Sequence, residues 1–385
     1  MSLFKNKEQS YLGIDIGTNS IKLVELESVA GRPRLVTYGM VEIDSPIARG
    51  NDSGDNTEDN QKIAASLVAL LKKSGARSRS SVAALPNFSV FASIISLPKL
   101  GEKQLAEAVQ WEAKKFVPMP IENVVLDWKI LNEADQDEEE GEEGEEKKKT
   151  QEAQVQKTKK SYENSNLAKC KTVAQILLTA APRHLVERYV AVFKLAGITL
   201  LSLETESFAL ARSLVGNEEG SILIADVGSL TTDVTVVKKG VPVFSRSINV
   251  GGGTVTRAIA DSMGISPERA EQFKRDTGIA SSGGSASAGG VIGVIQQSFS
   301  PVISEMKYTI EREQNAGAPI EKILLTGGSA LLASLPGYIS TSLGVKVFIA
   351  NPWARVSYPK DLGGVLDQIA PRMGVAIGLA MREIE

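Results

Sequence analysis

Two short segments of the sequence combine an aspartate, a glycine and hydroxyl or amide side chains after an apolar run. They are Asp15-Ile-Gly17-Thr18-Asn19-Ser20 and Asp226-Val-Gly228-Ser229-Leu-Thr231-Thr232. Glycine allows a tight turn that can approach phosphate oxygens, and turn amides and hydroxyls can donate hydrogen bonds to those oxygens. The aspartate supplies a hard oxygen for Mg²⁺, often through water. Two such turns that face each other would hold a triphosphate from both sides.

The two segments form an internal repeat. Their aspartates lie 211 residues apart (226 − 15), and a second apolar strand follows each turn. One Asp-x-Gly turn alone is weak evidence, because many hairpins contain it. The matched pair predicts two halves of related architecture, each of which opens with a β-hairpin.

Two further glycine turns stand between a strand and a helix. Thr326-Gly327-Gly328-Ser329 follows an apolar strand, and paired glycines there would let an adenine or ribose lie against the backbone near a helix N-terminus. A plain tight strand–helix turn is the alternative. Gly251-Gly252-Gly253-Thr254 opens another helix and could face a phosphate.

Apolar patterning predicts the elements that would position these turns. Strands are expected at 11–16, 21–26, 35–43, 82–85 and 198–203 around the first turn, and at 222–226, 233–237, 241–248, 322–326 and 345–349 around the second. Helices are expected near Ile63–Leu71 and at 184–195, 206–214, 254–263, 267–277, 294–315, 331–342 and 370–382. Strands that alternate with helices indicate the α/β class.

The middle of the chain has a different texture. Strands at 90–97 and 124–131 flank a helix marked by Leu105, Val109 and Phe116, in which Trp111 and Phe116 are expected to contribute to the core. Residues 133–146 are almost wholly acidic and 147–160 are polar and basic, so 132–169 is predicted to be a disordered loop. The strands on either side would then pair as a hairpin. A docking role for the charged stretch is the alternative to a solvated loop.

Composition limits the classes of function. A chain of 385 residues suits several subdomains, and its net charge of −3 gives no support for nucleic-acid binding. The one cysteine, Cys170, can form no internal disulfide, and the one histidine, His184, supports no catalytic triad. No run of eighteen apolar residues occurs, and the N-terminus does not resemble a secretory signal. These features predict a cytoplasmic protein.

The order of these motifs resembles the actin superfamily, and within it most closely the PilM family, which is related to the division protein FtsA. The resemblance covers nearly the whole chain. It is carried by Leu3-Phe-Lys, the 13–26 segment, Leu97-Pro98, Ala108–Ala113, Phe116–Pro120, Ala196-Gly197-Ile198, Glu204–Leu210 and Glu268–Arg275. The acidic stretch is not part of the family pattern.

The resemblance implies an actin-like two-lobe nucleotide-binding fold of duplicated ribonuclease H-like domains, with a small subdomain in the FtsA-type position. The implied boundaries are 1–86 and 183–205 for the first lobe, 87–182 for the small subdomain and 206–350 for the second lobe. Residues 351–385 would close the first lobe.

The resemblance also implies roles for the motif residues. Asp15 and Asp226 would organise Mg²⁺, and Gly327, Gly328 and Ser329 would contact the nucleoside of ATP. Phosphate contacts would come from Gly17, Thr18, Asn19, Ser20 and Lys22 in one lobe and from Gly228, Ser229, Thr231 and Thr232 in the other. Glu271 and Lys274 would bracket the ribose hydroxyls, although this spacing is also that of a surface ion pair. Glu206 matches the position of a glutamate that orients water in hydrolytic relatives.

PilM-like chains act as ATP-binding scaffolds of type IV pilus assembly. The resemblance therefore implies that this chain binds the cytoplasmic N-terminal tail of a PilN-like inner-membrane protein, in a groove beside the small subdomain, and links it to pilus motor components. Membrane association would be indirect, at the inner face of the inner membrane, with weak or no ATPase activity. The alternatives are an FtsA-like division or filament-forming ATPase, a related secretion-system component, and a sugar kinase, for which no substrate-base carboxylate stands out.

Overall fold

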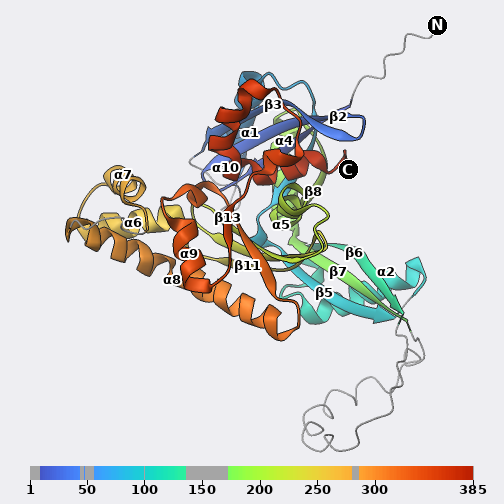
Figure 1. Cartoon of the computed structure of the whole chain (residues 1–385). Helices are drawn as coiled ribbons and strands as arrows, with labels where there is room; N and C mark the ends of the chain where they lie inside the picture. Colours follow the sequence, from blue (N-terminus) through green and yellow to red (C-terminus); the bar gives the residue numbers. More distant parts are fainter. Residues whose placement is uncertain are drawn as a thin grey trace, which may run out of the picture. The chain divides into compact units, whose positions relative to one another are not determined.

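The computed structural model describes residues 9–43, 47, 56–98, 100–135, 172–279 and 286–384. The chain divides into a larger unit, Met1–Val90 with Pro182–Glu385, and a smaller unit, Phe91–Ala181. Figure 1 shows the elements of both units along the chain. Among the described residues, no helix combines the length and the apolar character that a bilayer crossing requires.

The first sheet of the larger unit has five strands in the order β3-β2-β1-β4-β8. They are β1 (Ser10–Ile16), β2 (Ser20–Val29), β3 (Arg32–Glu42), β4 (Ser80–Leu85) and β8 (Thr199–Thr205). The β1–β2–β3 meander is antiparallel, whereas β4 and β8 continue the sheet in parallel. Helices α1 (Thr57–Ser74) and α4 (Arg183–Leu195) pack together beside this sheet. Because helices cover the sheet, successive residues of β1, which point to opposite faces, are buried on both faces.

The second sheet repeats this topology strand by strand. Its order is β11-β10-β9-β12-β13, with an antiparallel meander followed by two parallel neighbours. The strands are β9 (Ser221–Val227), β10 (Thr232–Lys238), β11 (Val241–Ile248), β12 (Ile320–Thr326) and β13 (Val347–Ile349). Its core joins these strands to α6 (Gly252–Met263), α7 (Pro267–Thr277), α8 (Ala286–Asn315) and α9 (Leu335–Leu343). The duplicated α/β architecture predicted from the internal repeat is confirmed.

Helix α10 (Gly363–Met381) connects the two sheets. It contacts β1, β2 and β4 of the first sheet, β12 of the second, and α5 (Glu206–Leu210). A Cβ on Gly13 of β1 would lie 1.9 Å from the Ala376 carbonyl oxygen, and a Cβ on Gly378 would lie 1.9 Å from that of Ala209. The two glycines therefore allow backbone-to-backbone contact on both sides of α10.

The smaller unit is a three-stranded sheet in the order β5-β7-β6 with α2 (Glu102–Phe116) on one face. Its strands are β5 (Phe91–Pro98), β6 (Val124–Asp135) and β7 (Thr172–Pro182). Strands β6 and β7 are neighbours, as predicted for a hairpin around the acidic stretch. Because β6 extends to Asp135, the predicted loop begins too early, and its remainder at 136–169 lies outside the described residues.

Two sequence-based expectations about helices were wrong. Trp111 and Phe116 do not belong to the core, since they are 62% and 48% exposed. The core stripe of α2 is Leu105, Val109 and Ala113 at a spacing of four, and Trp111 lies off this stripe with the Lys115 ammonium 4.0 Å from its ring centre. The single helix expected at 331–342 is instead a short 3₁₀ turn at Gly328–Leu331 and α9, because Ser334 has a positive φ of 63° and Pro336 follows.

The close contacts of α10 predict a large stability difference between two glycine-to-alanine substitutions. Gly378→Ala should destabilise the protein by about 2–4 kcal/mol, because its methyl group would meet the Ala209 carbonyl and force overpacking. Gly337→Ala in α9 is the matched control, since no atom lies within 4 Å of its added Cβ. Urea unfolding of both variants would measure the difference, and equal midpoints would contradict the proposed role of the close contact.

Candidate functional site

The two Asp-x-Gly turns are closed by the same backbone hydrogen bond. Gly17 N donates to Ser20 O at 3.0 Å, and Gly228 N donates to Thr231 O at 2.9 Å. Both turns line one cleft of about 840 Å³ in the larger unit. The internal repeat therefore places two equivalent turns on the wall of one cavity.

The two hairpins differ in the residue that faces the aspartate across the strands. Asp15 pairs in register with Lys22, and Asp226 pairs in register with Asp233, the equivalent position of the repeat (233 − 22 = 211). Lys22 Nζ lies 2.7 Å from Asp15 Oδ2. Asp233 instead accepts a hydrogen bond from the Ser247 hydroxyl. One turn thus carries a neutralised pair and the other carries two carboxylates.

Burial raises the pKa values of three carboxylates in the cleft, and neighbouring carboxylates add to this for Asp226 and Glu206. Burial first, and Asp233 second, raise the pKa of Asp226 to about 7, and burial raises the pKa of Asp233 to about 6. Burial, Asp233, Asp15 and Asp226 hold the pKa of Glu206 well above its ordinary value. A bound cation would relieve this crowding of negative charge.

Asp15 and Asp226 line the cleft and fit a Mg²⁺ ion that is held mainly by water and phosphate oxygens. Magnesium is commonly bound through one or two carboxylates with several retained waters. Among the described residues, no group of three or more His, Cys, Asp or Glu side chains could hold a metal ion. The available donors therefore match shared coordination with a phosphate ligand rather than a cage built by the protein.

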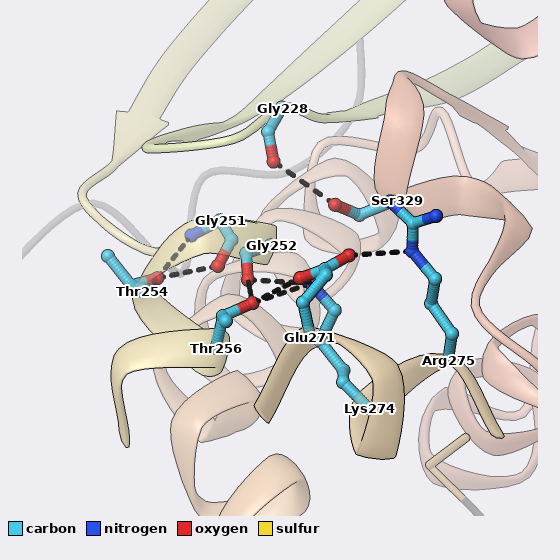
Figure 2. Close-up of polar contacts among 9 residues, drawn as sticks. All are labelled: Gly228, Gly251, Gly252, Thr254, Thr256, Glu271, Lys274, Arg275 and Ser329. Carbon is cyan, nitrogen blue, oxygen red and sulfur yellow. Dashed lines mark hydrogen bonds and ion pairs between the residues drawn. The ribbon is translucent and has the colours of Figure 1, made fainter. Parts of the chain in front are cut away.

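The start of α6 is bonded to the second hairpin. Gly252 N donates to Gly228 O at 2.9 Å, and Gly253 N donates to Ser229 O at 2.7 Å. The Ser329 hydroxyl donates to the same Gly228 O at 3.2 Å (Figure 2). Gly252, Gly253 and Ser329 all line the cleft. However, the two glycine amides are occupied by the hairpin, so they brace the turn and leave phosphate contacts to the turn itself.

Two threonines predicted to contact phosphate do not line the cleft. The Thr254 hydroxyl accepts a hydrogen bond from Gly251 N and donates one to Gly251 O, so it caps the start of α6. Thr232 is fully buried, and its hydroxyl donates to Val250 O at 2.7 Å. Side chains alternate between the faces of a strand, so the neighbours Thr231 and Asp233 face the cleft whereas Thr232 faces away.

Glu271 and Lys274 belong to a bonded cluster between α7 and α6 (Figure 2). Lys274 Nζ donates to Gly252 O at 2.9 Å, to Thr256 Oγ1 at 2.8 Å and to Glu271 Oε2 at 2.6 Å. Lys274 is 7% exposed, so this is not a surface ion pair. An ammonium group has three N–H donors, so Lys274 fixes the start of α6 and has no donor left for a ribose.

Glu271 is available to a ligand as an ionised acceptor. It lines the cleft and also accepts a hydrogen bond from Arg275 Nε at 2.8 Å. Burial opposes its ionisation, but hydrogen bonds from Lys274, Thr256 and Arg275 outweigh burial and lower the pKa to about 2. A permanently ionised carboxylate at this position suits the hydroxyl groups of a ribose.

The Gly327–Ser329 turn joins the second hairpin to α10. Gly327 has a φ of 87°, and a Cβ there would lie 2.4 Å from Asp226 Oδ1. Its amide donates to Pro371 O at 2.7 Å, and the Thr326 hydroxyl donates to the same oxygen at 2.8 Å. A glycine is thus required at position 327 because of its close contact with Asp226. Of the three turn residues, Gly328 and Ser329 also line a side pocket of about 320 Å³, whereas Gly327 does not.

Glu206 lies in the cleft beside a residue that sequence reasoning missed. Its Oε2 accepts a hydrogen bond from Asn87 N at 3.1 Å, and the Ser207 amide and hydroxyl both donate to Asn87 Oδ1. The Ser207 hydroxyl also reaches Ser245 on β11 at 3.1 Å. Asp233, Thr256 and Arg372 are further cleft residues that were not predicted. The repeat could have identified Asp233 as the counterpart of Lys22, whereas no motif marks Asn87 or Arg372.

Comparison with known proteins finds similar folds and a related sequence. A PilM-PilN type IV pilus biogenesis complex contains a chain that is 25% identical, with a TM-score of 0.74 and coverage of 97% of this chain and 98% of that one. The ethanolamine utilization protein EutJ from Carboxydothermus hydrogenoformans is 18% identical with a TM-score of 0.51, over 97% and 89% of the two chains, which shows similarity of fold alone.

The cell division protein FtsA of Neisseria meningitidis serogroup B is 26% identical over 185 residues, and the match spans 41% of each chain. The chain thus covers less than half of this relative. The family described as type IV pilus assembly protein PilM matches residues 13–144 and 161–384. Because this match extends over most of the sequence, the chain belongs to the PilM family of type IV pilus assembly proteins.

Proposed function

We propose that this chain is an ATP-binding scaffold of type IV pilus assembly. In this proposal, Mg-ATP binds in the cleft, and the smaller unit binds the cytoplasmic N-terminal segment of a PilN-like inner-membrane protein and connects it to the pilus motor. The observation that carries the nucleotide part is the pair of equivalent turns on one cleft, with Asp15 and Asp226 at their bases.

The lining of the cleft supports a nucleotide rather than an uncharged ligand. Its volume of about 840 Å³ lies within the usual range for small-molecule sites. The turn at Gly17–Ser20 and the turn at Gly228–Thr231 offer hydroxyls and amides to phosphate oxygens, while Glu271 offers an acceptor to ribose hydroxyls. The side pocket beside Gly328 is lined in part by Phe299, Leu331 and Leu332, which suits the apolar faces of a base.

The partner part of the proposal rests on family membership and on exposed groups of the smaller unit. The similar chain whose structure is known belongs to a PilM-PilN complex. On this chain, Trp111 and Phe116 are exposed large hydrophobic side chains on α2. Aromatic side chains of this kind are enriched at protein interfaces, and an extended segment can also add to a sheet edge through main-chain hydrogen bonds.

An ATPase activity is the second candidate, and Glu206 is the observation that favours it. Its carboxylate lies in the cleft with Asp15 and Asp226, where it could orient a water molecule. Burial and the neighbouring carboxylates hold its pKa well above the ordinary value, which opposes the ionised form that would act on water. We therefore propose slow hydrolysis at most.

Removal of either aspartate should weaken Mg-ATP binding. Asp15→Ala and Asp226→Ala should each cost about 1–3 kcal/mol, the scale for the loss of one partner of a charged group. Asp361→Asn is the matched control, because Asp361 is exposed and does not line the cleft. Titration calorimetry would measure all three, and unchanged affinity in both aspartate variants would contradict the assignment.

Mg-ATP affinity should fall as the pH falls from 8 to 6. The pKa of Asp226 is raised to about 7, so this carboxylate is mostly ionised at pH 8 and mostly protonated at pH 6. Loss of one required ionisation predicts a decrease of about tenfold across this interval. Asp233→Asn removes the neighbouring negative charge and should move the transition to lower pH, whereas an identical pH profile would show that Asp233 does not control Asp226.

Partner binding should depend on the nucleotide state. The two turns lie on different sheets, so bound ATP would favour one arrangement of the larger unit, and a partner that prefers this arrangement must be coupled to ATP reciprocally. A PilN-like N-terminal peptide should therefore bind with an affinity that changes by about 1–3 kcal/mol on saturation with Mg-ATP. Asp15→Ala should abolish the change, and equal affinities under all conditions would leave ATP as a structural ligand only.

Trp111→Ala separates the partner site from the nucleotide site. If α2 contacts the peptide, this variant should lose peptide affinity while Mg-ATP affinity stays unchanged. The exposed Phe348 on β13 provides the control, because it is a similarly exposed aromatic residue in the larger unit. Peptide binding that is equally sensitive to Phe348→Ala would argue against a site on α2.

A further inference from the structure

Arg372 on α10 lines both the cleft and the side pocket, yet its guanidinium has no hydrogen bond or ion pair within the part of the chain that the structure describes. The other cations beside it are engaged. Lys274 is bonded to three acceptors, and Arg275 is paired with Glu271. Arg372 is therefore a positive group of the side pocket that is available to a ligand.

Hydrogen bonds to the backbone of α10 fix the position of the Arg372 main chain. The preceding residue, Pro371, accepts hydrogen bonds from Gly327 N and from the Thr326 hydroxyl. If Gly328 carried a Cβ atom, that atom would lie 3.7 Å from Arg372 Nε. The guanidinium thus lies against the Gly328 backbone, at the border between the cleft and the side pocket.

The side pocket that Arg372 lines has apolar as well as charged residues in its wall. Phe299, Leu331 and Leu332 contribute to the lining, and the pocket volume is about 320 Å³. This volume lies at the lower end of the usual range for small-molecule sites and can accommodate a ring system. A flat guanidinium attracts the face of an aromatic ring and stacks on it, and a ring bound here would also have Phe299, Leu331 and Leu332 in the pocket wall.

We propose that Arg372 stacks its guanidinium on the face of the nucleobase and holds the base in the side pocket. This inference rests on the proposed nucleotide-binding function and adds to it a residue that contacts the base. Because every base has a π face, the contact favours a nucleotide over bare polyphosphate without distinguishing adenine from guanine. Base choice would then depend on edge contacts from other residues of the pocket.

The test compares Arg372→Gln and Arg372→Lys with the wild-type chain by titration with Mg-ATP, Mg-GTP and magnesium tripolyphosphate. Both variants should lose about tenfold in affinity for each nucleotide, because lysine keeps the charge but not the flat stacking group. Their affinity for tripolyphosphate should stay within about twofold of wild type. Unchanged thermal unfolding would show that both variants fold, as expected for a side chain without a polar partner.

The outcomes separate this inference from the proposed function. If Arg372→Gln binds nucleotide as tightly as the wild type, the stacking role is overturned while nucleotide binding stands. Recovery by Arg372→Lys, or a parallel loss of tripolyphosphate affinity, would overturn it in favour of a phosphate contact. A wild-type chain that binds neither nucleotide would overturn the nucleotide-binding function and this inference together. Arg257→Gln provides a charge control, since Arg257 lines the cleft but not the side pocket and should affect nucleotides and tripolyphosphate alike.

Discussion

The arrangement of the larger unit depends on how closely the backbone of α10 approaches β1 on one side and α5 on the other. Neither approach leaves room for a Cβ at Gly13 or Gly378. The same helix then accepts hydrogen bonds from Thr326 and Gly327 through the carbonyl of Pro371. Gly327 in turn contacts the Asp226 carboxylate closely. One helix thus relates the first sheet to a cleft carboxylate of the second through backbone distances, which are stiffer than side-chain contacts. These backbone contacts of α10 therefore contribute to the separation of the two turns.

The duplication supplies two turns of the same shape, and a single change of residue gives them different electrostatics. Lys22 neutralises Asp15, whereas Asp233 stands at the equivalent position beside Asp226. Like charges opposite each other in a sheet are destabilising, and here burial adds to the cost. The second hairpin is consequently the half of the cleft that gains most from a cation, while the first already contains one. For the Mg²⁺ proposed above, this asymmetry would favour a position nearer to Asp226, with Asp15 held in place by its own ion pair.

The sequence predicted the parts of the molecule that follow from local pattern. The strand–turn–strand repeat was sufficient to predict the duplicated fold. Most of the motif residues line the cleft because both turns lie on it. Thr232 was assigned wrongly because strand alternation turns it away from its neighbours, and Thr254 because a hydroxyl at the start of a helix caps its own backbone. Lys274, Asn87 and Arg372 acquire their roles from tertiary neighbours more than twenty residues away. No local pattern carries that information, whereas the exposure of Trp111 follows from its place off the stripe of Leu105, Val109 and Ala113 on α2.

The two halves of the candidate site differ in how far they are assembled without a ligand. On the second sheet, Gly228 is bonded by Gly252 and Ser329, and Lys274 joins Gly252 to Thr256 and Glu271. These contacts tie the turn, α6 and α7 into one cluster whose polar groups are satisfied mainly by one another. The first turn has fewer such bonds: its own closing hydrogen bond, one from Ile43 N to Asn19 O at 2.9 Å, and the Lys22–Asp15 pair. A ligand that binds the second half first would meet a rigid surface and lose little of its binding energy to reorganisation. Any conformational response to the phosphates then falls on the first turn and on the elements attached to it, including the β4–Asn87 connection that leads into the smaller unit.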